Sequence, residues 1–524
     1  MGRQITLYDT TLRDGTQGEK IALSAEDKLR ILGKLDEFEI PYVEGGWPGS
    51  NPKDVRFFKM ARKVPLKATR LTAFGSTRRA QTKAEDDRHI KALLKTEVET
   101  VAVFGKSWDL HVSKILGASL EENLDMIEDT ISYLKKQGRL VVYDAEHFFD
   151  GYKHNPTYAL RTIEAAVKGG ADTVVLCDTN GGTLPHDIYA AMKKVMAQIT
   201  VPVGIHAHDD CGLALANAIT AVRAGATMVQ GTINGYGERC GNTDLVSAIG
   251  NLQLKMGHEC IPPDKLRRLT ELSRYVSEVA NVPPLNQRPF VGKSAFAHKG
   301  GVHVSAILKD PAAYEHIEPE EVGNRRRVLV SDLSGKSTIA YKAREMEIKA
   351  EGNGYDSEKI VAEIKKLEDQ GYQFDAAEGS LELLIRKVTG QFEEPFKLES
   401  FRVIIEKNRS GPSTAQATIK ISVGEDYEIT AAEGDGPVNA LDNALRKALT
   451  KFFPQIEEMG LVDFKVRVID GGGGTAAKVR VQIESRDPRE IWSTIGVSEN
   501  VIEASWQALV DSVQYKLSKA LNGK

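Results

Sequence analysis

The sequence predicts an α/β chain that begins with a (β/α)8 TIM barrel, continues through a helical linker region and ends in an α+β domain. Three observations predict this order. Strand-like and helix-like stretches alternate eight times within about the first 255 residues, which matches the size of a TIM barrel. The strands are apolar without clean alternation, as in parallel strands buried on both faces. From Lys397 onwards, groups of strands followed by a helix replace this pattern.

Eight short apolar stretches are the expected barrel strands, and a stretch of helical period follows each of them. They span residues 5–9, 42–45, 68–74, 100–104, 140–146, 173–178, 203–208 and 228–233. Residues 25–38 and 120–136 are typical of the helices, and Ser24 with Asp27 three positions later predicts an N-terminal cap for the first. A doubly wound open sheet is the alternative, but eight units favour the closed barrel.

The pattern changes after the barrel. Residues 256–395 combine Pro283-Pro284, several glycines and charged helical stretches such as 357–369, which predicts a helical linker region. Further on, strands are expected at 401–406, 413–423 and 427–431 before one helix, and at 464–469 and 477–484 before a second helix. We therefore divide the chain into a barrel (1–275), linker subdomains (276–395) and a C-terminal domain with a loose internal repeat (396–524).

Composition and charge exclude several classes of protein. Of the 524 residues, 41% are hydrophobic and 27% are charged, which is ordinary for a globular protein. A net charge of −4 argues against broad nucleic-acid binding. No apolar stretch approaches the roughly 18 residues of a membrane span, so no membrane insertion is expected. The four cysteines form no C-x-x-C pair, which suits a reducing, cytoplasmic location.

Ionisable residues gather where the expected strands end. In a TIM barrel the active site lies at the carboxyl ends of the strands. The residues at these ends are Arg13, Asp14, Glu44, Asp144, Glu146, Asp178, Thr179, His206, His208, Glu238 and Asn242. The sequence therefore predicts a polar site at this end of the barrel.

His206 and His208 are the clearest sign of a metal site. Residues two apart in a strand project to the same side, so both imidazoles can bind one divalent ion. Asp14 is the expected carboxylate ligand, and Asn242 supplies a neutral oxygen. Such a ligand set suits Mn, Mg, Zn or Co, and the sequence does not choose among them. Two histidines that only form hydrogen bonds are the structural alternative.

Arg13 and Thr179 each have a functional and a structural interpretation. The guanidinium of Arg13 can bind a carboxylate or stabilise an oxyanion, or it can form an ion pair with Glu44 or Glu146. The hydroxyl of Thr179 can hydrogen-bond a substrate carboxylate or cap a helix. Sequence alone leaves both choices open.

Three motifs together resemble one enzyme family. They are DTTLRDGTQ at 9–17, HAHDD at 206–210 and GYGERCGN at 235–242. They resemble the 2-isopropylmalate, homocitrate and citramalate synthase family, whose members condense acetyl-CoA with a 2-keto acid on a metal-bearing TIM barrel. The resemblance continues through SAFAHKGGVH at 294–303 and the C-terminal domain. Residues 42–54, YVEGGWPGSNPKD, are most similar to the citramalate synthase branch, whose keto acid is pyruvate.

The resemblance implies roles for individual residues. The family's metal ligands correspond to Asp14, His206, His208 and Asn242. Arg13 matches the arginine near the keto-acid carbonyl, and Glu146 and Thr179 match substrate residues after strands five and six. His303 and Tyr314 match a linker pair that reaches the active site of the partner subunit. The residues around the strand-five glutamate, YDAEH at 143–147, depart from the family pattern.

The implied reaction is a metal-dependent Claisen condensation of acetyl-CoA, the co-substrate, with pyruvate, which gives (R)-citramalate and CoA in isoleucine biosynthesis. Such an enzyme is an acyltransferase that converts the acyl group to alkyl on transfer. The base that removes the methyl proton is His303, Glu238, or Glu146 acting through water. The resemblance further implies a homodimer whose C-terminal domain is regulatory and binds isoleucine or leucine as an effector.

The size of the keto acid is the least specified part of this reading. Trp47, just after strand two, either narrows the pocket for pyruvate or packs under a barrel loop. Two other functions stay open. One is a 2-isopropylmalate synthase that takes 2-ketoisovalerate in the leucine pathway, and the other is a metal-dependent retro-aldol acyl-CoA lyase.

Overall fold

The computed structural model describes residues 2–349, 356–407, 409 and 411–521. The chain divides into two compact units. The first comprises Met1–Phe296 with Ile317–Arg325, and the second comprises Ala297–His316 with Arg326–Lys524. None of the described helices has the length and apolar character needed to cross a bilayer.

A closed barrel of eight parallel strands forms the centre of the first unit, within the described part of the chain. Its strands are β1 (Thr6–Asp9), β2 (Tyr42–Gly46), β3 (Arg70–Ser76), β4 (Thr100–Lys106), β5 (Leu140–Glu146), β6 (Thr173–Asp178), β7 (Val203–Ala207) and β8 (Met228–Gly231). The pairing of β1 with β8, which places Asp9 beside Gly231, closes the barrel. This confirms the predicted TIM barrel and rules out the open sheet.

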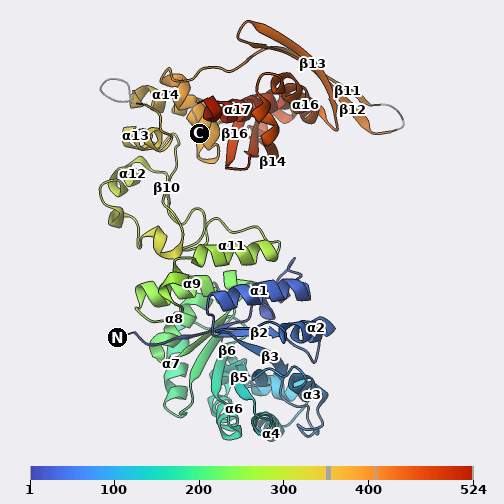
Figure 1. Cartoon of the computed structure of the whole chain (residues 1–524). Coiled ribbons are helices and arrows are strands. Elements are labelled where there is room, and N and C mark those ends of the chain that lie inside the picture. The colour runs from blue at the N-terminus through green and yellow to red at the C-terminus, as the bar shows by residue number, and fades with distance from the viewer. Residues whose placement is uncertain (1, 350–355, 408, 410, 522–524) are drawn as a thin grey trace. The chain divides into compact units, whose positions relative to one another are not determined.

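Helices surround the strands, as Figure 1 shows. They are α1 (Ala25–Glu37), α2 (Pro52–Ala61), α3 (Arg88–Leu94), α4 (Leu120–Lys136), α5 (Phe148–His154), α6 (Pro156–Gly169), α7 (Pro185–Met196) and α8 (Ala214–Ala224), followed by α9 (Leu245–Gly250), α10 (Pro263–Leu266) and α11 (Leu269–Val279). The predicted cap of α1 is a full capping box: Ser24 accepts from the Asp27 backbone, and the Asp27 carboxylate accepts from the Ser24 backbone.

Two predicted strands extend too far. The seventh ends at Ala207 instead of residue 208, and the eighth ends at Gly231 instead of residue 233. His208 forms an isolated backbone bridge with Asn242, and Ile233 begins a short 3-10 turn. The chain therefore leaves the sheet earlier than its apolar pattern suggests, because the following residues pair with the loop after β8.

The segment Ile317–Arg325 belongs to the first unit although it lies far along the chain. Thr270 donates a hydrogen bond to the carbonyl of Val322 at 2.8 Å. The Asn324 amide donates to the carbonyls of Phe290 and Gly292, each at 3.0 Å. These buried and partly buried contacts hold the segment against α11 and the chain that follows it.

The second unit begins with small helical elements and continues into two similar halves. The early elements are β9 (Ala297–His298), α12 (Gly301–Ile307), β10 (Arg327–Val328), α13 (Lys336–Glu345), α14 (Ser357–Asp369) and α15 (Glu378–Val388). The first half contains β11 (Lys397–Lys407), β12 (Ser413–Val423), β13 (Asp426–Gly434) and α16 (Pro437–Thr450). The second half contains β14 (Gly460–Val468), β15 (Val479–Arg486), β16 (Ile491–Ser498) and α17 (Val501–Leu521).

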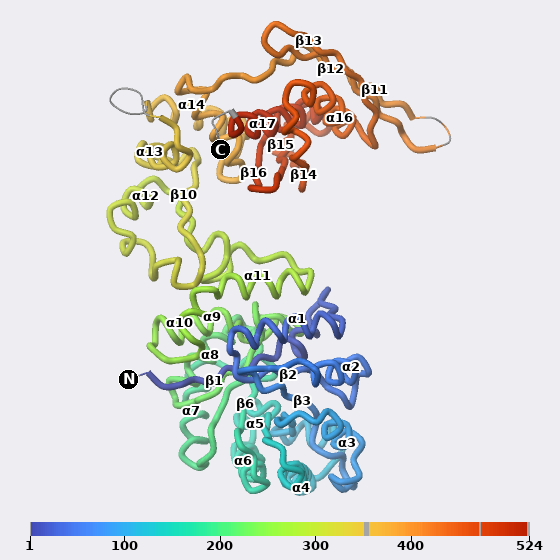
Figure 2. The backbone as a smooth tube through the Cα atoms, viewed as in Figure 1, coloured from blue at the N-terminus to red at the C-terminus, as the bar shows by residue number. Residues whose placement is uncertain are grey.

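Each half is an antiparallel three-stranded sheet followed by a helix, and in Figure 2 the backbone of β11 to β13 runs as long extended lengths side by side. The repeat is thus present, but the sequence analysis missed β16. The buried face of β16 carries Trp492, Thr494 and Gly496, and small or polar residues hide the apolar alternation there. Only its pairing with β15 reveals the strand.

Candidate active site

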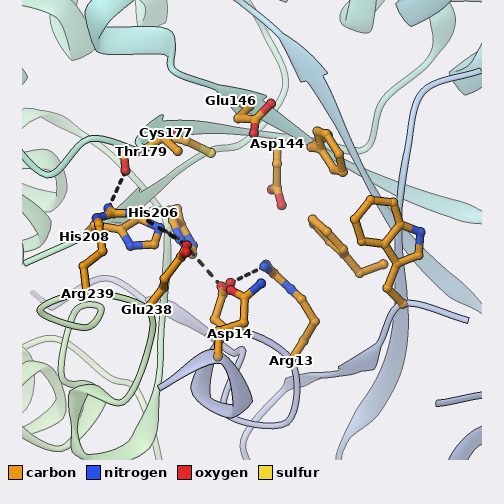
Figure 3. A pocket seen from close by; sticks show the side chains of 14 residues that line it. Arg13, Asp14, Asp144, Glu146, Cys177, Thr179, His206, His208, Glu238 and Arg239 are labelled. Atoms are coloured by element: carbon orange, nitrogen blue, oxygen red, sulfur yellow. Dashed lines mark hydrogen bonds and ion pairs between the residues drawn. The ribbon is translucent and has the colours of Figure 1, made fainter. Parts of the chain in front are cut away.

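A pocket of about 200 Å³ lies at the carboxyl ends of the barrel strands. Figure 3 shows side chains from different strands that point into it. Its lining residues are Arg13, Asp14, Gln17, Trp47, Phe74, Phe104, Asp144, Glu146, Cys177, Thr179, His206, His208, Glu238 and Arg239. The pocket therefore brings together the predicted strand-end residues apart from Glu44, Asp178 and Asn242. Glu44 binds Arg13, Asp178 accepts a hydrogen bond from Thr183, and Asn242 lies beside His208 through the backbone bridge.

The two imidazoles face each other. His206 lies in β7, and His208 is the first residue after the end of this strand. The Nε2 atoms of the two rings are 3.4 Å apart. Two nitrogens that each bind one ion at about 2.1 Å lie roughly 3.0–3.4 Å apart at common ligand angles. The Asp14 carboxylate approaches from the 3-10 turn Asp14–Gln17 after β1, with Oδ2 at 3.7 Å from His206 Nε2.

Three buried side-chain atoms of the proposed metal ligands have no hydrogen-bond partner. They are Asp14 Oδ2, Asn242 Oδ1 and His208 Nδ1. Asn242 donates its amide N–H to the carbonyl of Tyr236 at 3.0 Å, which leaves the oxygen available. Buried polar atoms without partners are costly, so these oxygens are the atoms that a bound cation would satisfy.

The side chains of the proposed ligands do not converge fully on one metal position in this arrangement. Among the residues that the structure describes, no three His, Cys, Asp or Glu side chains surround one ion-sized position. One carboxylate oxygen of Asp14 is instead held by the guanidinium of Arg13. The donor atoms nevertheless have the chemistry of a divalent-ion site: two neutral imidazoles, one carboxylate and one amide oxygen.

Burial keeps both imidazoles neutral. It lowers the pKa of His206, although the nearby Asp14 opposes this shift. Burial, followed by the neighbouring His206, lowers the pKa of His208 to about 3. Neutral imidazole is the form that binds metal ions, so neither ring needs to lose a proton at neutral pH.

Gln230 supports His206 from the next strand. Its Oε1 lies 2.9 Å from His206 Nδ1, and its Nε2 donates to Asp144 Oδ1 at 3.0 Å. Gln230 is fully buried and is the register partner of His206 across β7 and β8. Sequence reasoning missed it, because only the strand register reveals that it is a neighbour of the histidine.

Arg13 lies between two carboxylates. Its Nε donates to Glu44, its Nη1 donates to Asp14, and its guanidinium carbon lies 3.8 Å from the centre of the Phe74 ring. Burial lowers the pKa of Arg13, but Asp14 and Glu44 outweigh it and raise this pKa overall. The structure therefore forms the ion pair of Arg13 with Glu44. Glu146, the other partner that the sequence allowed, pairs with Lys106.

Two carboxyl groups near Arg13, those of Glu44 and Asp144, are buried. Glu44 is fully buried and accepts a hydrogen bond from the hydroxyl of Tyr8 at 2.7 Å. Burial raises the pKa of Glu44 despite the charge of Arg13. Burial, with a contribution from Glu44, also raises the pKa of Asp144 well above its ordinary value. These groups therefore hold protons more tightly than exposed carboxylates.

Glu146, Thr179 and Glu238 also line the pocket. Glu146 forms an ion pair with Lys106 at the end of β4. Thr179 accepts a hydrogen bond from the backbone N–H of His147 at 2.9 Å. Its hydroxyl proton therefore stays available for another acceptor. Glu238 is more open, with 59% of its side chain exposed.

Trp47 belongs to an aromatic wall. Its ring meets Phe74 and Phe104 edge-on, at centroid distances of 5.8 and 5.5 Å. The indole Nε1 is buried without a hydrogen-bond partner. Trp47 thus both lines the pocket and packs on neighbouring rings. Its role in selecting pyruvate stays a prediction.

His303 and Tyr314 lie in the second unit and are close to each other. Their rings stack with centroids 4.2 Å apart. Next to Tyr314, the buried Glu315 binds Arg326 and accepts a hydrogen bond from His298 Nε2 at 3.0 Å. The pair therefore lies on a segment that the contacts of Glu315 anchor within the second unit.

Comparison with known proteins places the chain in a family. Residues 4–276 match the model described as HMGL-like, residues 290–372 match "Homocitrate synthase post-HMGL domain-like", and residues 375–517 match the LeuA allosteric (dimerisation) domain. The (R)-citramalate synthase of Aquifex aeolicus is similar over the full length, at 54% identity over 521 residues, which is 99% of each chain. The chain belongs to the (R)-citramalate synthase family.

Another member of the (R)-citramalate synthase family, from Geobacter sulfurreducens, is 54% identical over 517 residues and 98% of each chain. A 2-isopropylmalate synthase from Methanocaldococcus jannaschii is 31% identical over 521 residues, which is 98% of this chain and 95% of that protein. The chain is thus markedly more similar to these (R)-citramalate synthases than to this 2-isopropylmalate synthase.

Proposed function

We propose that the chain catalyses the condensation of acetyl-CoA with pyruvate to (R)-citramalate and CoA. The observation that carries this proposal is the 54% identity over 99% of the chain to a protein named (R)-citramalate synthase. The pocket agrees with it, since two facing imidazoles, a carboxylate and an arginine meet at the strand ends. The reaction is an acyl transfer in which the acetyl group becomes an alkyl group of the product.

We propose Asp14, His206, His208 and Asn242 as the ligands of a divalent cation. Mn, Mg, Zn and Co stay open as its identity. When bound, the cation supplies Lewis acidity that polarises the ketone of the keto acid. Arg13 supplies a fixed positive charge beside the ketone of the keto acid, and its ion pairs with Glu44 and Asp14 hold the orientation of the guanidinium. It thereby stabilises the negative charge that develops on the ketone oxygen.

The remaining groups bind and orient the substrates. The Thr179 hydroxyl, which already accepts the His147 N–H, has its own proton to donate to the keto-acid carboxylate. The aromatic wall around Trp47 limits the space for the keto-acid side chain and excludes water. We propose that Glu146, His303 or Glu238 takes the methyl proton of acetyl-CoA, and that Tyr314 positions His303 through the ring stack.

Regulation and assembly are part of the same proposal. The match to a LeuA allosteric (dimerisation) domain supports a homodimer whose residues 396–524 bind an amino-acid effector, isoleucine or leucine. The division into a catalytic barrel (1–275), linker subdomains (276–395) and this domain is also a proposal, as is a cytoplasmic location.

CoA release tests the function directly. Purified protein with Mn or Mg is given acetyl-CoA and either pyruvate, 2-ketobutyrate, 2-ketoisovalerate or 2-ketoglutarate. We expect release with pyruvate, and loss of release when EDTA is added. Preference for 2-ketoisovalerate would place the chain in the leucine pathway. Absence of release with every acceptor would favour the lyase alternative, which cleavage of an acyl-CoA substrate would then reveal.

The base is tested by hydrogen exchange. Glu146→Gln, Glu238→Gln and His303→Asn variants are incubated in D₂O with acetyl-CoA and a non-condensing keto-acid analogue. The variant that lacks the base loses deuterium incorporation into the methyl group, whereas a variant that only weakens binding recovers it at higher acetyl-CoA concentration.

A further inference from the structure

We propose that Gln230 is a positioning residue that fixes the tautomer of His206 and thereby prepares it to bind the cation. This inference rests on the ligand set proposed above. It concerns a residue outside that set, one strand away, whose amide joins a proposed ligand to the buried carboxylate of Asp144.

The position of Gln230 makes it a specific partner of His206. The two residues are opposite each other in the parallel pairing of β7 with β8. Gln230 has no exposed surface, and His206 retains only 6%. Water therefore has little access to the contact between His206 Nδ1 and the Gln230 amide oxygen, which lie 2.9 Å apart.

The orientation of the Gln230 amide follows from Asp144. The amide NH₂ faces Asp144 Oδ1 at 3.0 Å. Asp144 can accept this hydrogen bond whether its carboxyl is ionised or protonated, because a protonated carboxyl keeps an oxygen that accepts. The amide oxygen then faces His206. Since that oxygen can only accept, the proton of His206 lies on Nδ1, and the lone pair lies on Nε2.

The freed lone pair points to the ligand group. His206 Nε2 is the atom that lies 3.4 Å from His208 Nε2 and 3.7 Å from Asp14 Oδ2. The opposite amide orientation would aim an N–H at His206 Nδ1 and move the ring proton to Nε2, where it blocks a metal bond. Asp144 therefore orients Gln230, and Gln230 orients His206, as in other sites where a hydrogen-bonded neighbour sets the ligand tautomer.

Metal affinity is the decisive measurement, because it does not depend on catalysis. Metal-free full-length protein is titrated with Mn²⁺ and the EPR signal of free Mn²⁺ is followed. Gln230→Met keeps the size of the side chain but removes the amide, and we expect it to weaken Mn²⁺ binding about 10- to 100-fold. Gln514→Met is the matched control, because it makes the same change at a buried glutamine of α17. We expect it to leave the affinity unchanged.

A second variant covers the case in which Gln230→Met fails to fold. Gln230→Glu retains an acceptor for His206 Nδ1–H, so we expect it to bind Mn²⁺ more tightly than Gln230→Met and within about tenfold of the wild type. In metal-free protein labelled with ¹⁵N-histidine, the wild-type His206 signal should show the Nδ1–H tautomer. A purely packing role for Gln230 would not determine this signal.

The outcomes separate this inference from the proposed ligand set. Absence of Mn²⁺ binding by the wild type would refute the ligand set itself. Binding by the wild type that is lost in His208→Asn but stays within twofold in Gln230→Met would refute only the role of Gln230. A Gln230→Glu variant that binds as weakly as Gln230→Met, or an Nε2–H tautomer in the wild type, would also overturn it.

Discussion

Arg13 shows how a single side chain combines structure and chemistry. It donates to Glu44 through Nε and to Asp14 through Nη1, and its planar group covers the Phe74 ring. Only a guanidinium can span both carboxylates and stack on a ring at the same time. The structural and functional interpretations of Arg13 from the sequence are therefore compatible, since the ion pairs hold the charge where the ketone oxygen is proposed to bind.

Replacing Arg13 by Lys tests this arrangement. The compact ammonium cannot reach both partners, so we expect Arg13→Lys to lower kcat by about 10²–10³-fold, in line with the loss of one preorganised charge donor. Steady-state kinetics with pyruvate measure the effect. Tyr8→Phe is the control, since it removes the other partner of Glu44 without touching the pocket charge. A kcat within threefold of wild type in Arg13→Lys would contradict the proposed role.

Trp47 sets the size of the pocket if its aromatic wall contacts the keto-acid side chain. Trp47→Ala removes the ring that meets Phe74 and Phe104. We expect the ratio of kcat/KM for 2-ketoisovalerate to that for pyruvate to rise by about tenfold or more, because one or two methylenes are worth about 1–3 kcal/mol each in a fitted pocket. An unchanged ratio, with kcat/KM lowered equally for both acids, would show that Trp47 serves packing alone.

At the scale of elements, α1 and α11 are joined by a network of exposed charges. Lys34 binds both Glu37 and Glu271, and Arg268 binds the same two carboxylates. Hydrogen bonds from Arg268, followed by those from Lys34, lower the pKa of Glu271 to about 2. Because Glu271 is half exposed, its contribution to stability stays within about 1 kcal/mol.

The lowered pKa of Glu271 fixes the direction of a pH effect. A carboxylate whose pKa is lower in the folded state than in the unfolded state stabilises the fold above about pH 4.5, and this stabilisation is lost as the pH falls towards 2. We expect Glu271→Gln to lower Tm at pH 7 and to lose less Tm than wild type between pH 4.5 and 3. Glu278→Gln on the same helix is the control. Equal pH profiles for Glu271→Gln and wild type would contradict the expectation.

At the scale of the whole molecule, the C-terminal sheets leave apolar side chains uncovered. On β14, Phe464, Val466 and Val468 are 36%, 47% and 56% exposed. On β13, Tyr427 and Ile429 are 63% and 64% exposed. Exposed apolar groups on a strand at a sheet edge are typical of protein interfaces. This distribution supports the proposed homodimer.

A charge on β14 tests the dimer. We expect Val466→Asp to shift the protein towards monomer, because a carboxylate would be buried against apolar groups of the second subunit. Light scattering after size-exclusion chromatography measures the mass. Lys465→Asp, one residue away on the other side of the same strand, is the control and should remain dimeric. A Val466→Asp variant that stays dimeric at low micromolar concentration would place the interface elsewhere.

The sequence by itself determined the order and type of most elements. Residues 140–146, 173–178, 357–369 and 413–423 coincide with β5, β6, α14 and β12, because each has a strong apolar period and clear boundaries. The H-x-H spacing and the strand-end motifs likewise identified the pocket before any contact was known. The sequence pattern did not predict β16, because the polar Thr494 and the small Gly496 on its buried face interrupt the apolar alternation.

Only the tertiary structure decided which polar groups meet. Closure of β8 onto β1 brings the Asp14 turn to the imidazoles of β7. Parallel register places Gln230 against His206, and the alignment of β4 with β5 places Lys106 against Glu146. These partners are about 20 to 200 residues apart in sequence, and no local period records them. The sequence gives the chemical type of each side chain, whereas the strand register and the closure of the barrel determine which hydrogen-bond or ion-pair partner it meets.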